Sequence, residues 1–394
     1  MIRKSTIANI IFIIAVLYIL SPWTFEKRFL FNEVLAATGF FLLVIKKFRI
    51  GNDPVSFAVM LLITWGGIHA IVSLARMDTV YFYLRNLVIL YSMMSFFIGF
   101  YLLKYLGAFI RKIRALLRAF IGIFLFIPLP RTLFERFGVA MLFPALFKNA
   151  AAKWVGLLLI VMSIIYGITY DSFTSMLAAG FFTLLFISPG YKFFVQVMFC
   201  VFVVFTVMFI YLHPNLSLIS YKFAFNTYNP IFNVMRSNPL LSIDGNSTWR
   251  LVLWNQLIVD DFPGNLFGLG FGTPVLKYYP VEDYSKLDTL PYVLGGHNSY
   301  VYLFARLGIV YLLITIYIYG ILFKEYFYHK AYYLANNQAL LFWSFFTMSI
   351  IALFNPALET PIYASAYWML LGFTARAIYN RKMLARTYED TVRS

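Results

Sequence analysis

Long apolar runs separated by short polar segments fill this chain. A helix that crosses a bilayer needs roughly 17–25 mostly apolar residues. Runs of about that length lie near residues 6–22, 29–45, 55–75, 81–103, 154–170, 172–188, 192–212, 299–323, 338–355 and 361–379. Two shorter runs, 115–128 and 133–148, lie on either side of a Pro-Leu-Pro segment. Together they predict about twelve helices by the length rule.

The composition points to a bilayer as the solvent. Hydrophobic residues make up 62% of the 394 residues, charged residues only 12%, and the mean hydropathy is +0.78. Soluble chains are nearer half apolar and a quarter charged. Membrane barrels show short alternating segments, whereas these runs are long and unbroken. The prediction is an all-α integral membrane protein. Its first run lacks a small-x-small cleavage site, so we expect a retained helix.

The positions of the basic residues predict the orientation. The net charge of +16 is gathered in short clusters between apolar runs, which is the positive-inside pattern and not a nucleic-acid surface. A cytoplasmic N-terminus places the basic clusters at 46–49, 104–118, 324–330 and 381–393 inside. This orientation requires an even number of crossings in the shorter runs, so we count both as spans. If one of them does not cross, the downstream orientation is reversed.

One long polar segment interrupts the helices. Residues 213–298 carry Pro, Gly, Asn and Asp at many positions but keep aromatic and aliphatic side chains throughout. A connection of this length is usually functional or disordered, and its apolar content favours a folded loop. The chain therefore divides into N-terminal membrane helices (1–212), an outer, periplasmic loop (213–298), and C-terminal membrane helices with a cytoplasmic tail (299–394).

The first candidate for chemistry is Arg250. Residues 247–254 read Ser-Thr-Trp-Arg-Leu-Val-Leu-Trp, which predicts an amphipathic helix beginning near Ser247. A planar guanidinium near a helix start on the outer side is a good ligand for phosphate oxygens. The alternative is an interfacial arginine paired with Asp244 or Asp260.

A glycine-rich turn follows. Gly268, Gly270 and Gly272 alternate with larger residues. Such glycines allow positive φ and let a ligand approach backbone N–H groups. A tight turn at the membrane surface is the more conservative interpretation.

The third candidate lies where the loop meets the next helix. Two glycines precede His297 and Asn298. A helix N-terminus favours anions, an imidazole can donate to a phosphate or accept a proton, and Asn298 can cap the helix. An N-capped helix with an exposed histidine is the alternative. The other histidines lack metal-ligand spacing, so no metal and no cofactor is expected. Cys200, the single cysteine, is expected to be a small buried side chain.

Four charged residues lie at or near membrane depth. They are Asp78, Arg85, Arg306 and Glu359. Such charges usually face a cavity or a partner. Arg306 lies about 13 Å along the helix from His297 and should face the bundle interior. Arg85 lies near the outer end of its helix. For each of the four, structural pairing, for example with Glu359, is at least as plausible as a ligand role, and Arg85 and Arg306 are the candidate substrate-binding residues among them.

These motifs in this order resemble the O-antigen ligase and polymerase superfamily. The resemblance rests on residues 250–254 (Arg-Leu-Val-Leu-Trp), 268–272 (Gly-Leu-Gly-Phe-Gly), 297–309 and the Asn-Pro-Ala-Leu-Glu-Thr-Pro segment at 355–361. It covers residues 247–310 and 353–375; the earlier spans match only in hydropathy and number.

The resemblance implies a metal-independent membrane glycosyltransferase of the GT-C type in the bacterial inner membrane. Its donor would be a glycan on undecaprenyl diphosphate, and its acceptor either lipid A core (ligase) or a second lipid-linked glycan (polymerase). By the match, Arg250 would hold the diphosphate and His297 would be the histidine at the loop end.

One part of the family pattern is missing. The family often has a Ser-Arg pair where an earlier helix emerges outside, but residues 170–175 read Tyr-Asp-Ser-Phe-Thr-Ser. A second phosphate ligand is then either missing or supplied by another residue, with Arg85, Lys222 and Arg236 as candidates. The rivals to a ligase are a polymerase with the same donor, a polar-lipid transporter or flippase, and a non-catalytic membrane scaffold.

Overall fold

The helices of this chain are seen in a computed structural model. It describes residues 31–45, 53–106, 180–181, 184–185, 188–217, 245–260, 262, 265–275, 298–336 and 338–393. Every regular element within these ranges is a helix, which confirms the all-α prediction for this part of the chain.

The observed helices follow the predicted apolar runs. They are α3 (Phe31–Ile45), α4 (Pro54–Leu74), α5 (Val80–Ser92), α11 (Tyr191–Ser217), α14 (Gly245–Asn255) with the π-turn η1 (Gln256–Asp260), α15 (Ser299–Tyr328), α16 (Lys330–Ala335), α17 (Ala339–Phe354) and α18 (Pro361–Arg393). After a turn at Met93, α5 continues as helix to Leu106. Starts agree with the predicted runs to within two residues. By contrast, α18 extends far beyond the predicted end at 379, because good helix formers continue there without glycine or proline.

Local chemistry explains where several helices begin. Asp53 caps α4, since its Oδ2 accepts from the Ser56 N–H at 2.8 Å, and Pro54 fits the first turn. Thr79 caps α5 in the same way, accepting from the Phe82 N–H at 3.2 Å. A proline also begins α18.

Among the residues that the structure describes, four helices are long and apolar enough to cross a membrane. They are Pro54–Leu74, Val80–Leu106, Tyr191–Pro214 and Ser299–Tyr328. The predicted spans at 6–22, 115–128, 133–148 and 154–170, and most of 172–188, lie outside the described residues. A total of twelve spans therefore stays a prediction.

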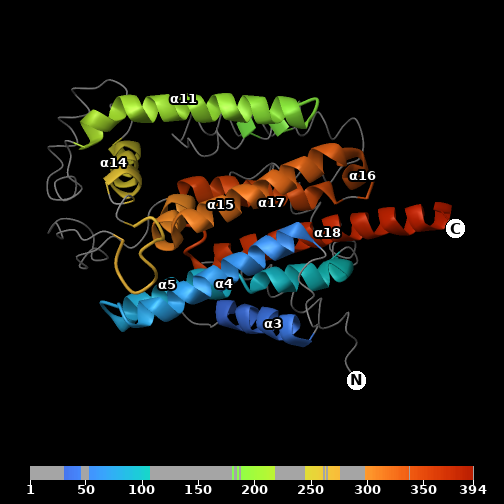
Figure 1. Cartoon of the computed structure of the whole chain (residues 1–394), viewed down its shortest axis with the longest axis horizontal. Helices are drawn as coiled ribbons and strands as arrows, with labels where there is room; N and C mark the ends of the chain where they lie inside the picture. Colours follow the sequence, from blue (N-terminus) through green and yellow to red (C-terminus); the bar gives the residue numbers. More distant parts are fainter. Residues whose placement is uncertain are drawn as a thin grey trace, which may run out of the picture.

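The helices form an elongated bundle (Figure 1). α15 packs against α4 and α17, α18 packs against α17 and α5, and α11 contacts α14 and α15. The crossing of α5 and α18 is close because two glycines meet the opposite backbone. A Cβ on Gly99 would collide with the Met369 carbonyl, and one on Gly372 with the Phe96 carbonyl. Small residues at such crossings are typical of membrane helices.

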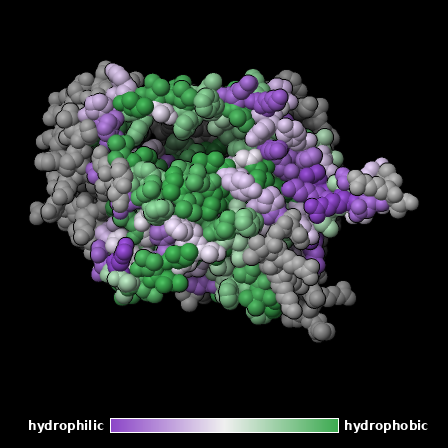
Figure 2. Space-filling model, viewed as in Figure 1, coloured by the Kyte–Doolittle hydropathy of each residue, from purple (hydrophilic) through white to green (hydrophobic). Residues whose placement is uncertain are grey.

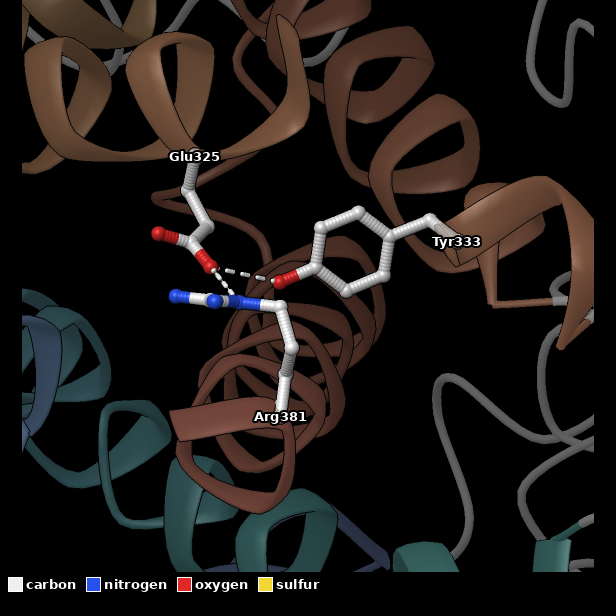
Figure 3. A network of polar contacts seen from close by, with 3 residues as sticks. All are labelled: Glu325, Tyr333 and Arg381. Atoms are coloured by element: carbon white, nitrogen blue, oxygen red, sulfur yellow. Dashed lines mark hydrogen bonds and ion pairs between the residues drawn. The ribbon is translucent and has the colours of Figure 1, made fainter. Parts of the chain in front are cut away.

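One end of the bundle is basic and carries a partly buried ion pair. Arg381 Nε of α18 lies 2.5 Å from Glu325 Oε1 of α15, and the Tyr333 hydroxyl of α16 donates to the same oxygen at 2.8 Å (Figure 3). Hydrophilic residues gather around the C-terminal part of α18, whereas apolar side chains cover the middle of the bundle (Figure 2). Lys330 and Arg376 belong to this end, where they contact aromatic rings. The predicted cytoplasmic placement of this end stays a prediction.

Candidate functional site

The candidate site lies at the opposite end of the bundle, where α14 meets the turn between α17 and α18. Val252, Leu253 and Leu257 are buried and fix α14 and η1 against the bundle. This leaves Arg250 beside the last residue of α17, where its Nη1 donates to the Phe354 carbonyl at 3.2 Å. A cation there also matches the negative end of the helix dipole.

The start of α15 approaches the same turn. Asn298 caps the helix as predicted, since its Oδ1 accepts from the N–H groups of Tyr300 (2.9 Å) and Val301 (3.1 Å). The next residue, Ser299, is buried and points into the turn that joins α17 to α18. His297 precedes this cap in the sequence but lies outside the described residues.

Ser299 binds the α17–α18 turn through three neighbours. Its Oγ accepts from the Leu358 N–H at 2.9 Å and lies 3.0 Å from the Asn355 carbonyl oxygen. It also lies 2.5 Å from Glu359 Oε2. The N-terminus of α15 is therefore held to a turn that presents a carboxyl group.

The environment of Glu359 favours its neutral form. Burial raises the pKa of this carboxyl to about 7, although hydrogen bonding to Ser299 and the positive charge of Arg85 act in the opposite direction. Arg85, on α5, thus lies within electrostatic range of Glu359, and an ion pair between the two stays a prediction. Arg250, Asn298, Glu359 and Arg85 come from four separate segments, and the fold brings them to one end of the bundle.

The glycine turn has the predicted conformation, but it is docked into the bundle. Gly268 has φ of 94° and Gly270 has φ of 74°. The Leu269 N–H donates to the Ala305 carbonyl and the Gly270 N–H to the Arg306 carbonyl, each at 2.9 Å. A ligand at this turn would compete with α15 for these groups, so any role of Gly268 and Gly270 in substrate binding stays a prediction.

This docking interrupts α15, which the sequence predicted to be continuous. Gly308 has non-helical angles (φ 68°, ψ −161°) inside the helix. The backbone groups released by the break find partners: the Ile309 N–H donates to the Leu266 carbonyl at 2.9 Å. The Leu307 carbonyl accepts from Trp65 Nε1 at 2.7 Å. Non-helical backbone at membrane depth needs such compensation.

Arg306 holds the docked segment, defined here as residues 265–275. The arginine is fully buried, as expected for the bundle interior. Its Nη1 donates to the carbonyls of Gly270 (3.0 Å) and Thr273, and its Nη2 to the Tyr302 hydroxyl at 3.0 Å. These contacts give Arg306 a structural role, and they do not support the predicted substrate contact.

Several of the residues named from the sequence lie outside the described part of the chain or differ from expectation. Lys222 and Arg236 lie outside the described residues, as does Asp244, one of the two suggested partners of Arg250. Cys200 is exposed on α11, so the expectation of a buried cysteine is wrong. Ser299 and Glu359 were not chosen as site residues; the signal was an acidic residue before a helix-initiating proline, at the membrane end of an apolar run. The described residues contain no group of three or more metal-ligand side chains.

Comparisons with known proteins add no identification. No family model, no curated protein and no solved structure matches this chain. What the fold and the site define is a helical protein with apolar helices of membrane-spanning length and a polar cluster at one end of the bundle.

Proposed function

We propose that this chain is a metal-independent membrane glycosyltransferase of the O-antigen ligase and polymerase superfamily. It would move a glycan en bloc from undecaprenyl diphosphate to a hydroxyl of lipid A core, at the periplasmic face of the bacterial inner membrane. The observation that carries the proposal is the position of Arg250. This arginine lies against the α17–α18 turn, next to the start of α15, where the sequence places His297.

The membrane orientation supports this placement. The basic end of the bundle belongs on the cytoplasmic side by the positive-inside rule. The cluster of Arg250, Ser299 and Glu359 is at the other end of the same helices, so it would face the outer leaflet. A donor whose lipid lies in that leaflet presents its diphosphate at this depth.

The chemistry would be a displacement at an anomeric carbon. The diphosphate is already a good leaving group, so the main task is to stabilise its growing negative charge and to orient an acceptor hydroxyl. A guanidinium carries five N–H donors. Arg250 can therefore bind phosphate oxygens while keeping its bond to the Phe354 carbonyl. His297 would donate to the diphosphate or take a proton.

A transporter or flippase is the rival from another class. Transporters often use a broken helix whose free backbone groups face the substrate. In α15 the carbonyls of Ala305, Arg306 and Leu307 are paired with the docked segment and with Trp65. The break thus serves packing, which favours a glycosyltransferase over a transporter.

Transfer by the purified protein in detergent, without added metal, tests the proposal. The donor is undecaprenyl-diphosphate glycan, offered with lipid A core or with a second lipid-linked glycan. Arg250→Ala and His297→Ala are each expected to lower transfer by about 10²–10³-fold, as for the loss of one charge-stabilising donor. Arg250→Lys keeps the charge without the planar fork and should recover only part of the activity.

Matched controls separate this effect from general damage. Arg76→Ala removes an exposed arginine at the same end, and His329→Ala removes a histidine at the basic end; both should transfer like wild type. Product on lipid A core identifies a ligase, and lengthening lipid-linked ladders identify a polymerase. Transfer that survives both Arg250→Ala and His297→Ala excludes the proposed site, and absence of transfer by wild type with both acceptors rejects the proposed function.

A further inference from the structure

The contacts of Ser299 bear on the protonation state of Glu359. Its hydroxyl has a single proton but two neighbouring acceptors, the Asn355 carbonyl at 3.0 Å and Glu359 Oε2 at 2.5 Å. A carbonyl can only accept. If the hydroxyl donates to Asn355, the short contact to Glu359 requires a proton on the carboxyl group. The site is therefore arranged so that Glu359 can hold a proton.

The backbone N–H groups of Leu358 and Glu359 also act on this carboxyl group, and its second oxygen is the one to which an acceptor hydroxyl would donate. Glu359 Oε1 is buried and has no hydrogen bond within the part of the chain that the structure describes. A buried acceptor without a donor costs roughly 1–3 kcal/mol. A bound group that donates to Oε1 would recover that cost, and a sugar hydroxyl is such a donor.

Several charged or titratable groups surround Glu359. Arg85 on α5 and Tyr311 on α15 interact with it electrostatically. Arg250 on α14 binds the carbonyl of Phe354, just before the turn. The carboxyl group therefore belongs to the same α17–α18 turn that follows the residue bound by Arg250, the arginine to which the donor diphosphate is assigned.

We propose that Glu359 is the catalytic base, which takes the proton of the acceptor hydroxyl during glycan transfer. This inference rests on the proposed function. The acceptor oxygen forms a bond to the anomeric carbon, and the bond from that carbon to the diphosphate oxygen breaks. The diphosphate leaves with the electron pair, and the hydroxyl proton passes to Glu359 Oε1. Water then takes this proton and restores the carboxylate.

The electrostatics are suited to this role. A pKa of about 7 leaves a substantial carboxylate fraction at neutral pH while keeping the group basic enough to accept a proton. The negative charge of a bound diphosphate favours the protonated carboxyl further, which strengthens the base as the leaving group departs. His297 is then assigned to the diphosphate.

The pH dependence of transfer by the full-length protein in detergent tests this inference. Wild type is compared with Glu359→Gln, which has the same shape without the base, and with Glu359→Asp, which keeps a shortened base. Asp78→Asn is the control, because Asp78 is an exposed acid at the same end. Donor affinity and thermal midpoint are measured for each variant. The infrared band of protonated carboxyl groups is followed against pH, with and without Glu359.

The expected result is transfer that rises with pH through about 7 in wild type and in Asp78→Asn. Glu359→Gln should lose this rise and fall by about 10²–10⁴-fold with donor affinity unchanged, and Glu359→Asp should keep the rise at a lower rate. A wild-type pH profile in Glu359→Gln overturns the inference, as does a loss of donor affinity that accounts for the whole decrease. In either case, loss of transfer in Arg250→Ala would leave the proposed function intact. No transfer by wild type rejects the proposed function itself.

Discussion

Gly308 is a position at which a single added methyl group should destabilise this protein. Its backbone angles (φ 68°, ψ −161°) belong to a region that only glycine occupies readily. A Cβ there would also meet backbone atoms of Leu266 and Phe267, which cannot move aside as a flexible side chain can. Gly308→Ala must therefore strain α15 and also push the docked segment away.

The cost can be estimated from the contacts. An L-residue held in such a conformation costs about 1–3 kcal/mol. Displacement of the docked segment would break the bond from the Ile309 N–H to the Leu266 carbonyl, which is worth about 1 kcal/mol net. We expect Gly308→Ala to lower the free energy of unfolding by about 2–4 kcal/mol.

The same helix provides a matched control. Gly320 has a helical backbone and open space around its Cα. Gly320→Ala should therefore leave stability unchanged or raise it by up to about 1 kcal/mol. Thermal midpoints of both variants in one detergent give the comparison. If Gly308→Ala and Gly320→Ala both have the thermal midpoint of wild type, α15 is not broken at Gly308 and the description of the docked segment is wrong.

Three further perturbations test other parts of the bundle. Arg381→Met should lower the free energy of unfolding by about 3–5 kcal/mol, because Glu325 stays buried without its partner. Adding Glu325→Gln to this variant should restore most of that free energy, as measured by thermal melts under the same conditions. Gly99→Ala should lower the thermal midpoint, because the added Cβ forces α5 away from a carbonyl of α18. Gly67→Ala is the control and should keep the wild-type midpoint, since an added Cβ there meets open space. Equal midpoints for the two variants would exclude the close crossing. The pKa of Glu359 is raised in the folded state, so stability should fall as pH rises from about 4.5 through about 7, by at most about 3 kcal/mol. Melts at pH 5 and pH 8 should differ less in Glu359→Gln than in wild type.

The sequence was sufficient to predict most helix starts. Asn298 and Pro361 are local signals, and the apolar runs that follow them have the length of a membrane span. Such features depend on neighbours in the chain, so periodicity and capping chemistry find them without a structure.

Features that depend on distant contacts were not predicted. Gly308 lies in a run that looks continuous, and its break becomes visible only once Leu266 is placed against Ile309. Arg306 looked like a ligand because it is a charge at membrane depth, but its partners are carbonyls that are 33 and 36 residues earlier in the chain. The pairing of Ser299 with Glu359 spans 60 residues and has no local pattern.

The interrupted helix has a consequence for how the protein is made. The docked segment precedes α15 in the chain, yet it hydrogen-bonds to the interior of α15 and to Ser73 of α4. During insertion, backbone groups of α15 without these partners would lie in hydrocarbon, which costs several kcal/mol for each group. α15 is therefore expected to enter the bilayer as one continuous helix and to open at Gly308 only when the preceding segment folds back. Assembly of this end of the bundle is thus expected to be a late step in biogenesis, separable in time from membrane insertion.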